Sequence, residues 1–218
     1  GGVDTSAILG TVTIYGALRS PDANITLGAI TLGSDLTIDS DSNNDATDGS
    51  ITLASADGGF DLTLDPDTGG SVTVNGAIGG ATPLTSFTVT SGVNVALESV
   101  TTTGSTPADT INIGSVAAIS GTVSVGTNGA STWATDGAGA NNNTGGIRIN
   151  AATAIDVQNS LVFDTNDGGT GTDGSISLAS STTFASNDDN DGLTFDLGTT
   201  ALSAGTWTFT DLDFLRIA

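Results

Sequence analysis

The sequence feature that most constrains the fold is a segment that occurs twice in similar form. Leu36–Ser55 reads LTIDSDSNNDATDGSITLAS, and Leu161–Ser180 reads LVFDTNDGGTGTDGSISLAS, with ten identical positions. Each copy consists of a short strand that alternates apolar and polar residues, an Asp/Asn/Gly/Thr loop, and a second strand of the same kind. Most of the remaining chain repeats this unit with a different loop, which predicts a stack of strand–turn modules.

The predicted strands are short, about three to five residues each. Examples are Thr11–Tyr15, Ala29–Leu32 and Ile147–Ile149. Sandwiches and barrels generally use strands of about 5–6 residues. Short strands between sharp Gly, Asn and Asp turns favour a parallel β-solenoid, in which each coil buries its apolar face only against its neighbours. No window repeats apolar residues with a helical period, so we expect an all-β chain with essentially no helix.

The expected domain organisation is a single solenoid over residues 1–218 that contains the duplication 36–55 and 161–180. Coils of three strands each are predicted over these segments: 25–38, 51–74, 87–97, 111–125, 147–163 and 176–209.

Several phrases carry a family resemblance. GSITLAS, DLTL, GSVTVNGAIGGATPLTSFTVTSGVNVAL and SVTTTG resemble the strand-repeat regions of giant exported bacterial surface proteins, the filamentous-haemagglutinin-like adhesins. The resemblance covers most of the chain. It implies a right-handed β-helix, export to the cell surface, and a role in adhesion or matrix scaffolding.

The charge of the chain is strongly unbalanced. Three basic residues (Arg19, Arg148 and Arg216) stand against 24 acidic ones, which gives a net charge of −21. Nucleic-acid backbones and anionic membrane surfaces both require clustered Lys and Arg, so neither is an expected partner. No apolar run approaches the length that a membrane-spanning helix needs, and membrane insertion is therefore not expected.

Catalysis is not expected either, because the chain has no His, Cys or Lys to act as base or nucleophile. One alternative stays open: a carbohydrate-binding or carbohydrate-cleaving β-helix protein that acts on extracellular polysaccharide. Glu98 and Asp156 are its candidate acids and Arg148 its candidate cation. For passive glycan binding, Trp133 and Tyr15 are the candidate stacking residues.

Calcium is the expected cofactor, because Asp and Asn at alternate positions of a turn can direct several oxygen atoms at one hard cation. The candidate ligands are Asp39, Asp41, Asn43, Asp45 and Asp48 in the first copy, Asp164, Asn166 and Asp173 in the second, and Asn187, Asp189 and Asp191 in a later loop. No loop supplies the bidentate Glu of an EF-hand. The alternative is that these loops are plain turns held by Asx hydrogen bonds.

The apolar tail 209–218 is the predicted capping strand, or a docking strand that enters the next subunit. Head-to-tail contacts that do not close produce filaments. The sequence therefore predicts an extracellular structural protein, secreted or on the cell surface. We expect it to be a subunit of a surface fibre, stalk or biofilm matrix filament with an adhesive role. Its expected partners are further copies of itself, end to end, and surface glycans.

Overall fold

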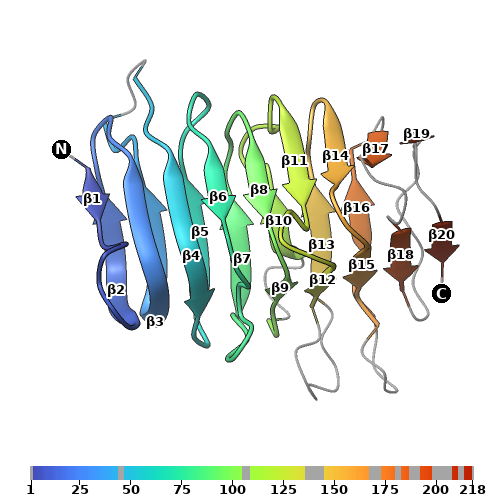
Figure 1. Ribbon diagram of the computed structural model, residues 1–218, viewed down its shortest axis with the longest axis horizontal. Helices are drawn as coiled ribbons and strands as arrows, with labels where there is room; N and C mark the ends of the chain where they lie inside the picture. Colours follow the sequence, from blue (N-terminus) through green and yellow to red (C-terminus); the bar gives the residue numbers. More distant parts are fainter. Residues whose placement is uncertain are drawn as a thin grey trace.

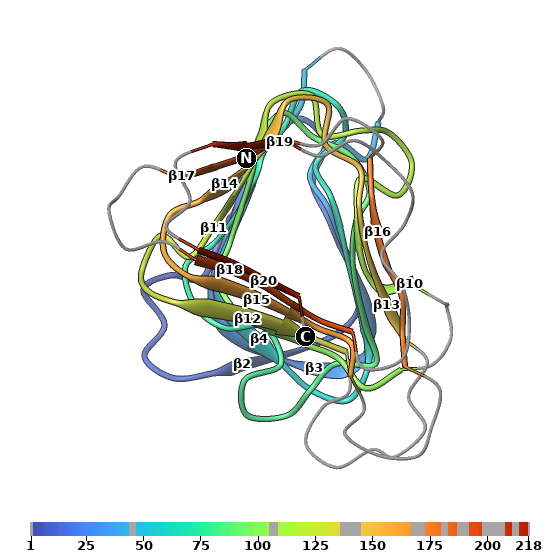
Figure 2. The same ribbon diagram turned by 90° about the vertical axis from the view of Figure 1, so that its right-hand side faces the viewer.

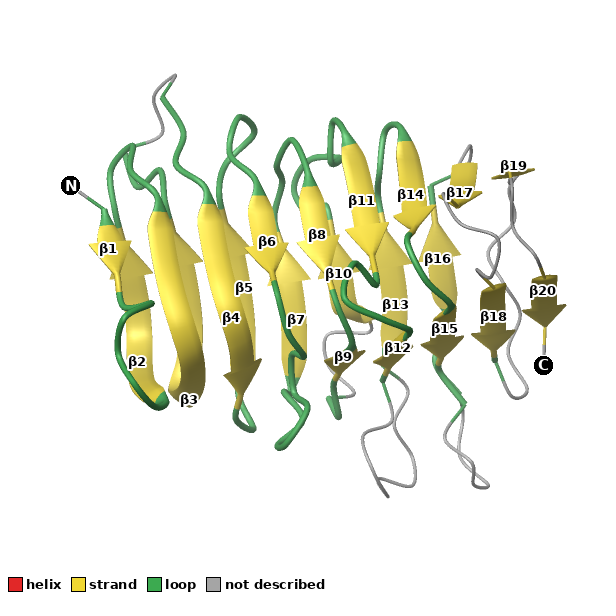
Figure 3. Ribbon diagram, viewed as in Figure 1, coloured by secondary structure: helices red, strands yellow, loops and turns green. Residues whose placement is uncertain are grey.

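The computed structural model describes residues 2–43, 47–104, 109–135, 145–166, 173–179, 183–186, 192–197, 208–210 and 214–217. Within these residues the chain forms strands joined by turns, and no helix (Figure 3). The expectation of an all-β chain is therefore confirmed for the described part.

The strands are β1 Val3–Asp4, β2 Val12–Arg19, β3 Ile25–Asp39, β4 Ile51–Asp57, β5 Asp61–Asp65, β6 Val72–Val74, β7 Ser86–Val89, β8 Val95–Leu97, β9 Val100–Thr101, β10 Asp109–Ile113, β11 Thr122–Val125, β12 Ser131–Ala134, β13 Gly146–Ile149, β14 Ala154–Val157, β15 Leu161–Asp164, β16 Ile176–Leu178, β17 Thr183–Ser186, β18 Gly192–Asp196, β19 Thr208–Thr210 and β20 Phe214–Ile217.

Every pairing between the described strands is parallel. The strands group into three sides. Side A holds β1, the first part of β3, β4, β6, β8, β11, β14, β17 and β19; side B holds β9, β12, β15, β18 and β20; side C holds the last part of β3, β5, β7, β10, β13 and β16. Strand β2 pairs with the later part of β3. Viewed end on, the sides outline a triangle (Figure 2), and the chain advances from one end to the other (Figure 1).

Strand β3 shows how the chain turns from one side to the next. Its first residues pair with the start of β4, whereas Leu36–Asp39 pair with Leu62–Asp65 of β5. The 15 residues of β3 therefore run across two corners without leaving the strand conformation. We call one passage of the chain through all three sides a circuit. Most later circuits are divided into separate short strands, because longer loops leave the strands at the corners.

The length of chain between successive partners on side A varies. The step from Ile51 to Val72 is much shorter than the step from Val123 to Ile155. A parallel ladder tolerates this variation because the extra residues lie in loops outside the pairing. The predicted grouping 51–74 was wrong: Val72 pairs with Ile51, so β6 begins a new circuit on the side where β4 began the previous one.

The two copies of the duplicated segment lie on different sides. In the first copy, Leu36 belongs to side C and Ile51 to side A. In the second copy, Leu161 belongs to side B and Ile176 to side C. The shared sequence therefore encodes a strand–loop–strand unit that fits more than one corner of the triangle.

The interior is built from rows of apolar side chains, one from each paired strand. Alternation places every second residue inward, and the burial pattern of β5, for example, alternates between half-buried and buried. One inward row of side A contains Ile25, Ile51, Val72, Val95, Val123, Ile155 and Phe184, and one of side C contains Leu36, Leu62, Phe87, Ile111, Ile147 and Ile176. Burying one such side chain contributes roughly 1.5–3 kcal/mol, which makes these rows the main source of stability.

The inward row of side B changes from aliphatic to aromatic along the stack. It begins with Ile30, Ala56, Ile78 and Val100 and continues with Trp133, Phe163 and Phe195. The rings of Trp133 and Phe163 meet edge to face at 5.6 Å, and those of Phe163 and Phe195 stack at 5.4 Å. Both geometries are favoured by aromatic quadrupoles.

The C-terminal tail continues the same ladders. Strand β20 pairs with β18, with Leu215 opposite Leu193 and Ile217 opposite Phe195. The side chains of Leu215 and Ile217 are 44% and 62% exposed. Of the segment 209–218 that was predicted to cap or dock, Phe209 and Thr210 belong to β19 on side A, and Phe214–Ile217 form a further parallel strand of side B. Residues 211–213 and 218 lie outside the described residues.

Candidate functional site

Three of the described acidic residues, Asp41, Asp48 and Asp67, converge at one corner, where the loops after side C strands stack on each other. Asp39 and Asp65 are in register on β3 and β5. Asp41 and Asp67 each follow two positions later. A carboxylate oxygen of Asp41, one of Asp48 and one of Asp67 all lie within 4.8 Å of one another.

Local packing holds these three side chains in place. Asp41 is buried at 2% exposure, and Asp48 and Asp67 are half-buried. Asp67 has a left-handed backbone with φ of 52°, a conformation that Asp tolerates better than most residues. Gly69 leaves room for the Asp48 carboxylate in its present position, because a Cβ atom at Gly69 would lie 2.0 Å from the Asp48 Oδ2 atom.

This arrangement is chemically suited to a hard divalent cation. Two full carboxylate charges within 4.8 Å of each other repel by at least about 3.5 kcal/mol at an effective dielectric constant of about 20. A cation between them removes that repulsion, and calcium takes about 6–8 oxygen ligands, with carboxylates among the preferred ones. Asp67 also lines a cavity of about 150 Å³ with Asp65 and Thr90.

The structure redistributes the predicted ligands of the first copy. Asp41 and Asp48 are brought together, but Asp39 instead forms an ion pair with Arg19, with Nε and Oδ2 3.7 Å apart. Asn43 is exposed, and Asp45 lies outside the described residues. The prediction missed Asp67. The signal for it was a repeated D-x-D pattern, Asp39-x-Asp41 and Asp65-x-Asp67, whose spacing along the chain equals that of the paired strands β3 and β5.

In the second copy, two of the predicted ligands, Asp164 and Asn166, are joined by a hydrogen bond. The backbone N–H of Asn166 donates to Asp164 Oδ1 at 3.1 Å, and the Asn166 carboxamide donates to Asp196 Oδ1 at 3.0 Å. Asp164 and Asp196 are in register on β15 and β18, so Asn166 bridges two stacked carboxylates. Asp173 is buried. Within the described residues, none of these joins a cluster of three acids.

Three further predicted ligands, Asn187, Asp189 and Asp191, lie outside the described residues.

Glu98, the candidate catalytic acid, is a buried turn residue. Its Oε1 atom accepts hydrogen bonds from Thr127 Oγ1 at 2.5 Å and from the backbone and side-chain nitrogens of Asn128, each at 3.0 Å. Its Oε2 atom lies 3.4 Å from Ser131 Oγ. Asp156 is in register with Ser124 on the neighbouring strand β11 and accepts from the Gln158 carboxamide. Through these hydrogen bonds Glu98 holds the turn between β11 and β12 in place.

The two candidate stacking residues have opposite environments. Trp133 is fully buried in side B and donates from Nε1 to the Glu98 carbonyl at 2.9 Å, so the interpretation of Trp133 as a glycan-stacking surface was wrong. Tyr15 is 68% exposed and its ring covers the backbone of Gly33, where a Cβ atom would lie 2.2 Å from Cε1.

Near the N-terminal end, hydrogen bonds from Ser6 lower the pKa of the Asp4 carboxyl group. The hydroxyl of Ser6 donates to Asp4 Oδ1 at 2.6 Å, and the backbone N–H of Ser6 donates to the same atom at 2.8 Å. These two hydrogen bonds lower the pKa of Asp4, because both favour the carboxylate form.

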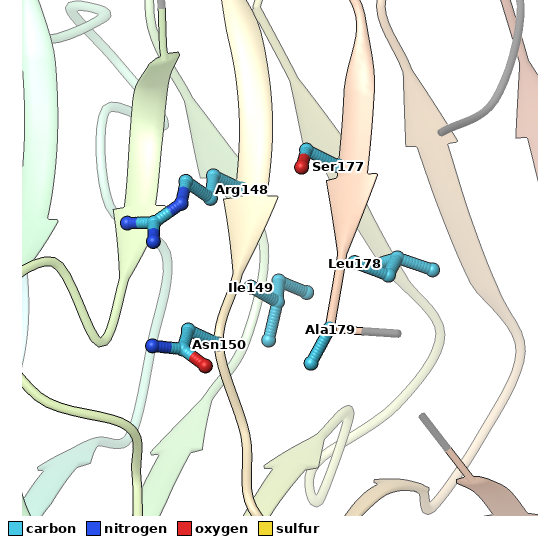
Figure 4. A pocket seen from close by; sticks show the side chains of 6 residues that line it. All are labelled: Arg148, Ile149, Asn150, Ser177, Leu178 and Ala179. Carbon is cyan, nitrogen blue, oxygen red and sulfur yellow. The ribbon is translucent and has the colours of Figure 1, made fainter. Parts of the chain in front are cut away.

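A second cavity, of about 120 Å³, lies at the end of side C between β13 and β16. It is lined by Arg148, Ile149, Asn150, Ser177, Leu178 and Ala179 (Figure 4). Ile149 and Leu178 belong to the buried interior, so the polar character of the cavity comes from Arg148, Asn150 and Ser177.

Comparisons with protein families, with curated proteins and with solved structures give no match to this chain. The described residues include no helix long and apolar enough to cross a membrane. The resemblance to filamentous-haemagglutinin-like adhesins therefore stays a prediction from the sequence.

Proposed function

We propose that this chain is an extracellular structural protein, a right-handed parallel β-solenoid that forms part of a surface fibre, stalk or biofilm matrix filament with an adhesive role. The observation that carries the proposal is the parallel register. It extends from β1 to β19 on side A, and the ladder has buried apolar residues from Ile25 of β3 to Phe184 of β17. Parallel crossovers are right-handed in about 98% of cases, which supports the proposed hand.

Architecture and charge support the same function. A ladder of this kind grows along one axis by adding strands, so it forms a rod whose length depends on the number of circuits. The net charge of −21 keeps the polar outer faces of neighbouring rods apart. Strand β20 is the edge strand of side B in the described part of the chain, and its Leu215 and Ile217 side chains are exposed. A strand of another copy can pair with this edge and continue the ladder.

Negative-stain electron microscopy of the purified chain, followed by diffraction from aligned material, tests the proposal. We expect elongated particles or filaments with a repeat of about 4.7–4.9 Å along the long axis, since parallel strands stack at that spacing. Compact particles, or a repeat perpendicular to the long axis, would contradict the solenoid.

End-to-end association is tested by Ile217→Asp, with Val116→Asp as the matched control. Val116 is 82% exposed but lies on a loop after β10, far along the chain from β20. If copies associate through the β20 edge, sedimentation velocity will show fewer large species for Ile217→Asp alone. Equal loss in both variants, or in neither, would exclude this edge as the contact.

We also propose that calcium binds the Asp41, Asp48 and Asp67 carboxylates and stabilises the corner that joins successive circuits. Calorimetric titration with calcium chloride should give saturable binding that Asp67→Asn weakens at least tenfold. The matched control is Asp22→Asn, because Asp22 is exposed and has almost the same backbone φ, 54°. Unchanged affinity in Asp67→Asn would mean that the corner is a plain turn.

A further inference from the structure

The cavity between β13 and β16 has an electrostatic environment that differs from the rest of the chain. Arg148 on β13 is in register with Asn112 on β10 and with Ser177 on β16. Its guanidinium extends to the side away from Ser177 (Figure 4). The positions two residues away on its own strand segment are Gly146 and Asn150. None of these four neighbours is acidic, although the chain carries 24 acidic residues.

The guanidinium of Arg148 retains donor capacity. Its Nη1 atom donates to Asn112 Oδ1 at 3.3 Å, and the ion pair found among the described residues involves Arg19 instead. A guanidinium has five N–H donors in a planar fork that matches a carboxylate. One long bond to a neutral carboxamide leaves most of them to a ligand.

The other polar side chains of the cavity can form hydrogen bonds with hydroxyl groups of a ligand. The Asn150 carboxamide nitrogen donates to the Gly114 carbonyl at 3.4 Å, which leaves its Oδ1 atom to accept. The hydroxyl of Ser177 can donate or accept. The cavity therefore combines one cation with neutral donors and acceptors.

The net charge limits which anions this cavity can bind. A polyanion would place further negative charges near the acidic surface of a chain with net charge −21, and repulsion between like charges opposes its approach. A ligand with a single carboxylate meets Arg148 directly, while acids more than about 8–10 Å away are largely screened at physiological salt.

We propose that the cavity at Arg148, Asn150 and Ser177 binds a saccharide that carries one carboxylate, a monouronate. The guanidinium of Arg148 pairs with the carboxylate, and Asn150 and Ser177 hydrogen-bond to ring hydroxyls. The cavity of about 120 Å³ accommodates the carboxylate and one edge of a sugar ring. This binding activity goes beyond the structural function and does not depend on polymerisation.

The test is an NMR titration of the full chain with sodium D-glucuronate, with D-glucose and sodium acetate as comparison ligands. We expect saturable binding of glucuronate, with glucose and acetate each at least tenfold weaker. Arg148→Gln should weaken glucuronate at least tenfold, and Arg148→Lys should weaken it less, because an ammonium keeps the charge but loses the fork. Arg19→Gln, a cation on the same side but paired with Asp39, should leave binding unchanged.

Several results would overturn the proposal. These are absence of saturable binding by the folded chain, equal affinity for acetate and glucuronate, and tighter binding of polygalacturonate than of glucuronate. Unchanged glucuronate affinity in Arg148→Gln would do the same. If Arg148→Gln fails to fold by circular dichroism, Ser177→Ala takes its place, with an expected threefold loss for glucuronate and none for acetate.

Discussion

The aromatic part of side B gives the most direct test of the packing. Phe163 is fully buried between Trp133 and Phe195 and contacts both rings. Phe163→Ala should lower the free energy of unfolding by about 3–5 kcal/mol, the range for buried Phe→Ala changes. Phe163→Leu retains most of the buried area but loses two ring pairs worth about 0.5–1.5 kcal/mol each, so we expect a loss of about 1–3 kcal/mol.

Urea unfolding followed by tryptophan fluorescence measures both changes. The chain has two tryptophans, so a Trp207→Phe background leaves emission from Trp133, which touches the altered ring. Phe60→Ala is the matched control, because Phe60 is 38% exposed and its truncation should cost under about 1 kcal/mol. A Phe163→Ala variant as stable as Phe60→Ala would refute the assignment of side B as a packed aromatic row.

Two further predictions concern corners of the triangle. Glu98→Ala removes the buried carboxylate that accepts hydrogen bonds from Thr127 and Asn128. Loss of hydrogen bonds to a charged group should cost about 1.5–3 kcal/mol in thermal unfolding, and an unchanged midpoint would contradict the structural role of this acid. Gly69→Ala should destabilise the chain and weaken calcium binding, since its Cβ atom would displace the Asp48 carboxylate, whereas Gly59→Ala has open space around its Cβ atom and should be nearly neutral. Similar midpoints for the two alanine variants would show that Asp48 can move at no cost.

Much of the fold could be predicted because alternation is a local property. In Leu62–Leu64 the apolar, polar, apolar order is visible in the sequence, and the structure buries the first and last residues. The short lengths and the glycine-rich turns excluded helices for the same reason. The strands with regular alternation were therefore accessible from the sequence, whereas β12, in a stretch without it, was not predicted.

The side to which each strand belongs could not be predicted. The strands that begin at Ile51 and Val72 have the same pattern, and nothing local shows that they stack directly on each other. Side membership depends on how many corners each loop turns, which is a long-range property. The burial of Trp133 was missed for a related reason: it stands in a polar, glycine-rich stretch, and only its register with Phe163 shows that it points inward.

The candidate cation site was predicted in part. Asp41 and Asp48 were identified because alternate acids in one loop suggested a metal site. Asp67 was missed because its proximity depends on the pairing of β3 with β5, which belong to successive circuits. A search for acids at the strand offset, in place of acids within one loop, would have found it.

The unequal placement of the duplicated segments has a genetic consequence. Recombination can occur between two similar stretches of a gene. An exchange between the stretches that encode these two segments would delete or repeat the part of the chain that separates them. The shortened product would join the side C strand that begins at Leu36 to the side C strand that begins at Ile176, without an intervening circuit. The lengthened product would join Leu161 of side B to Ile51 of side A and omit side C. Both products break the order of sides, so the fold itself disfavours changes in length at this repeat.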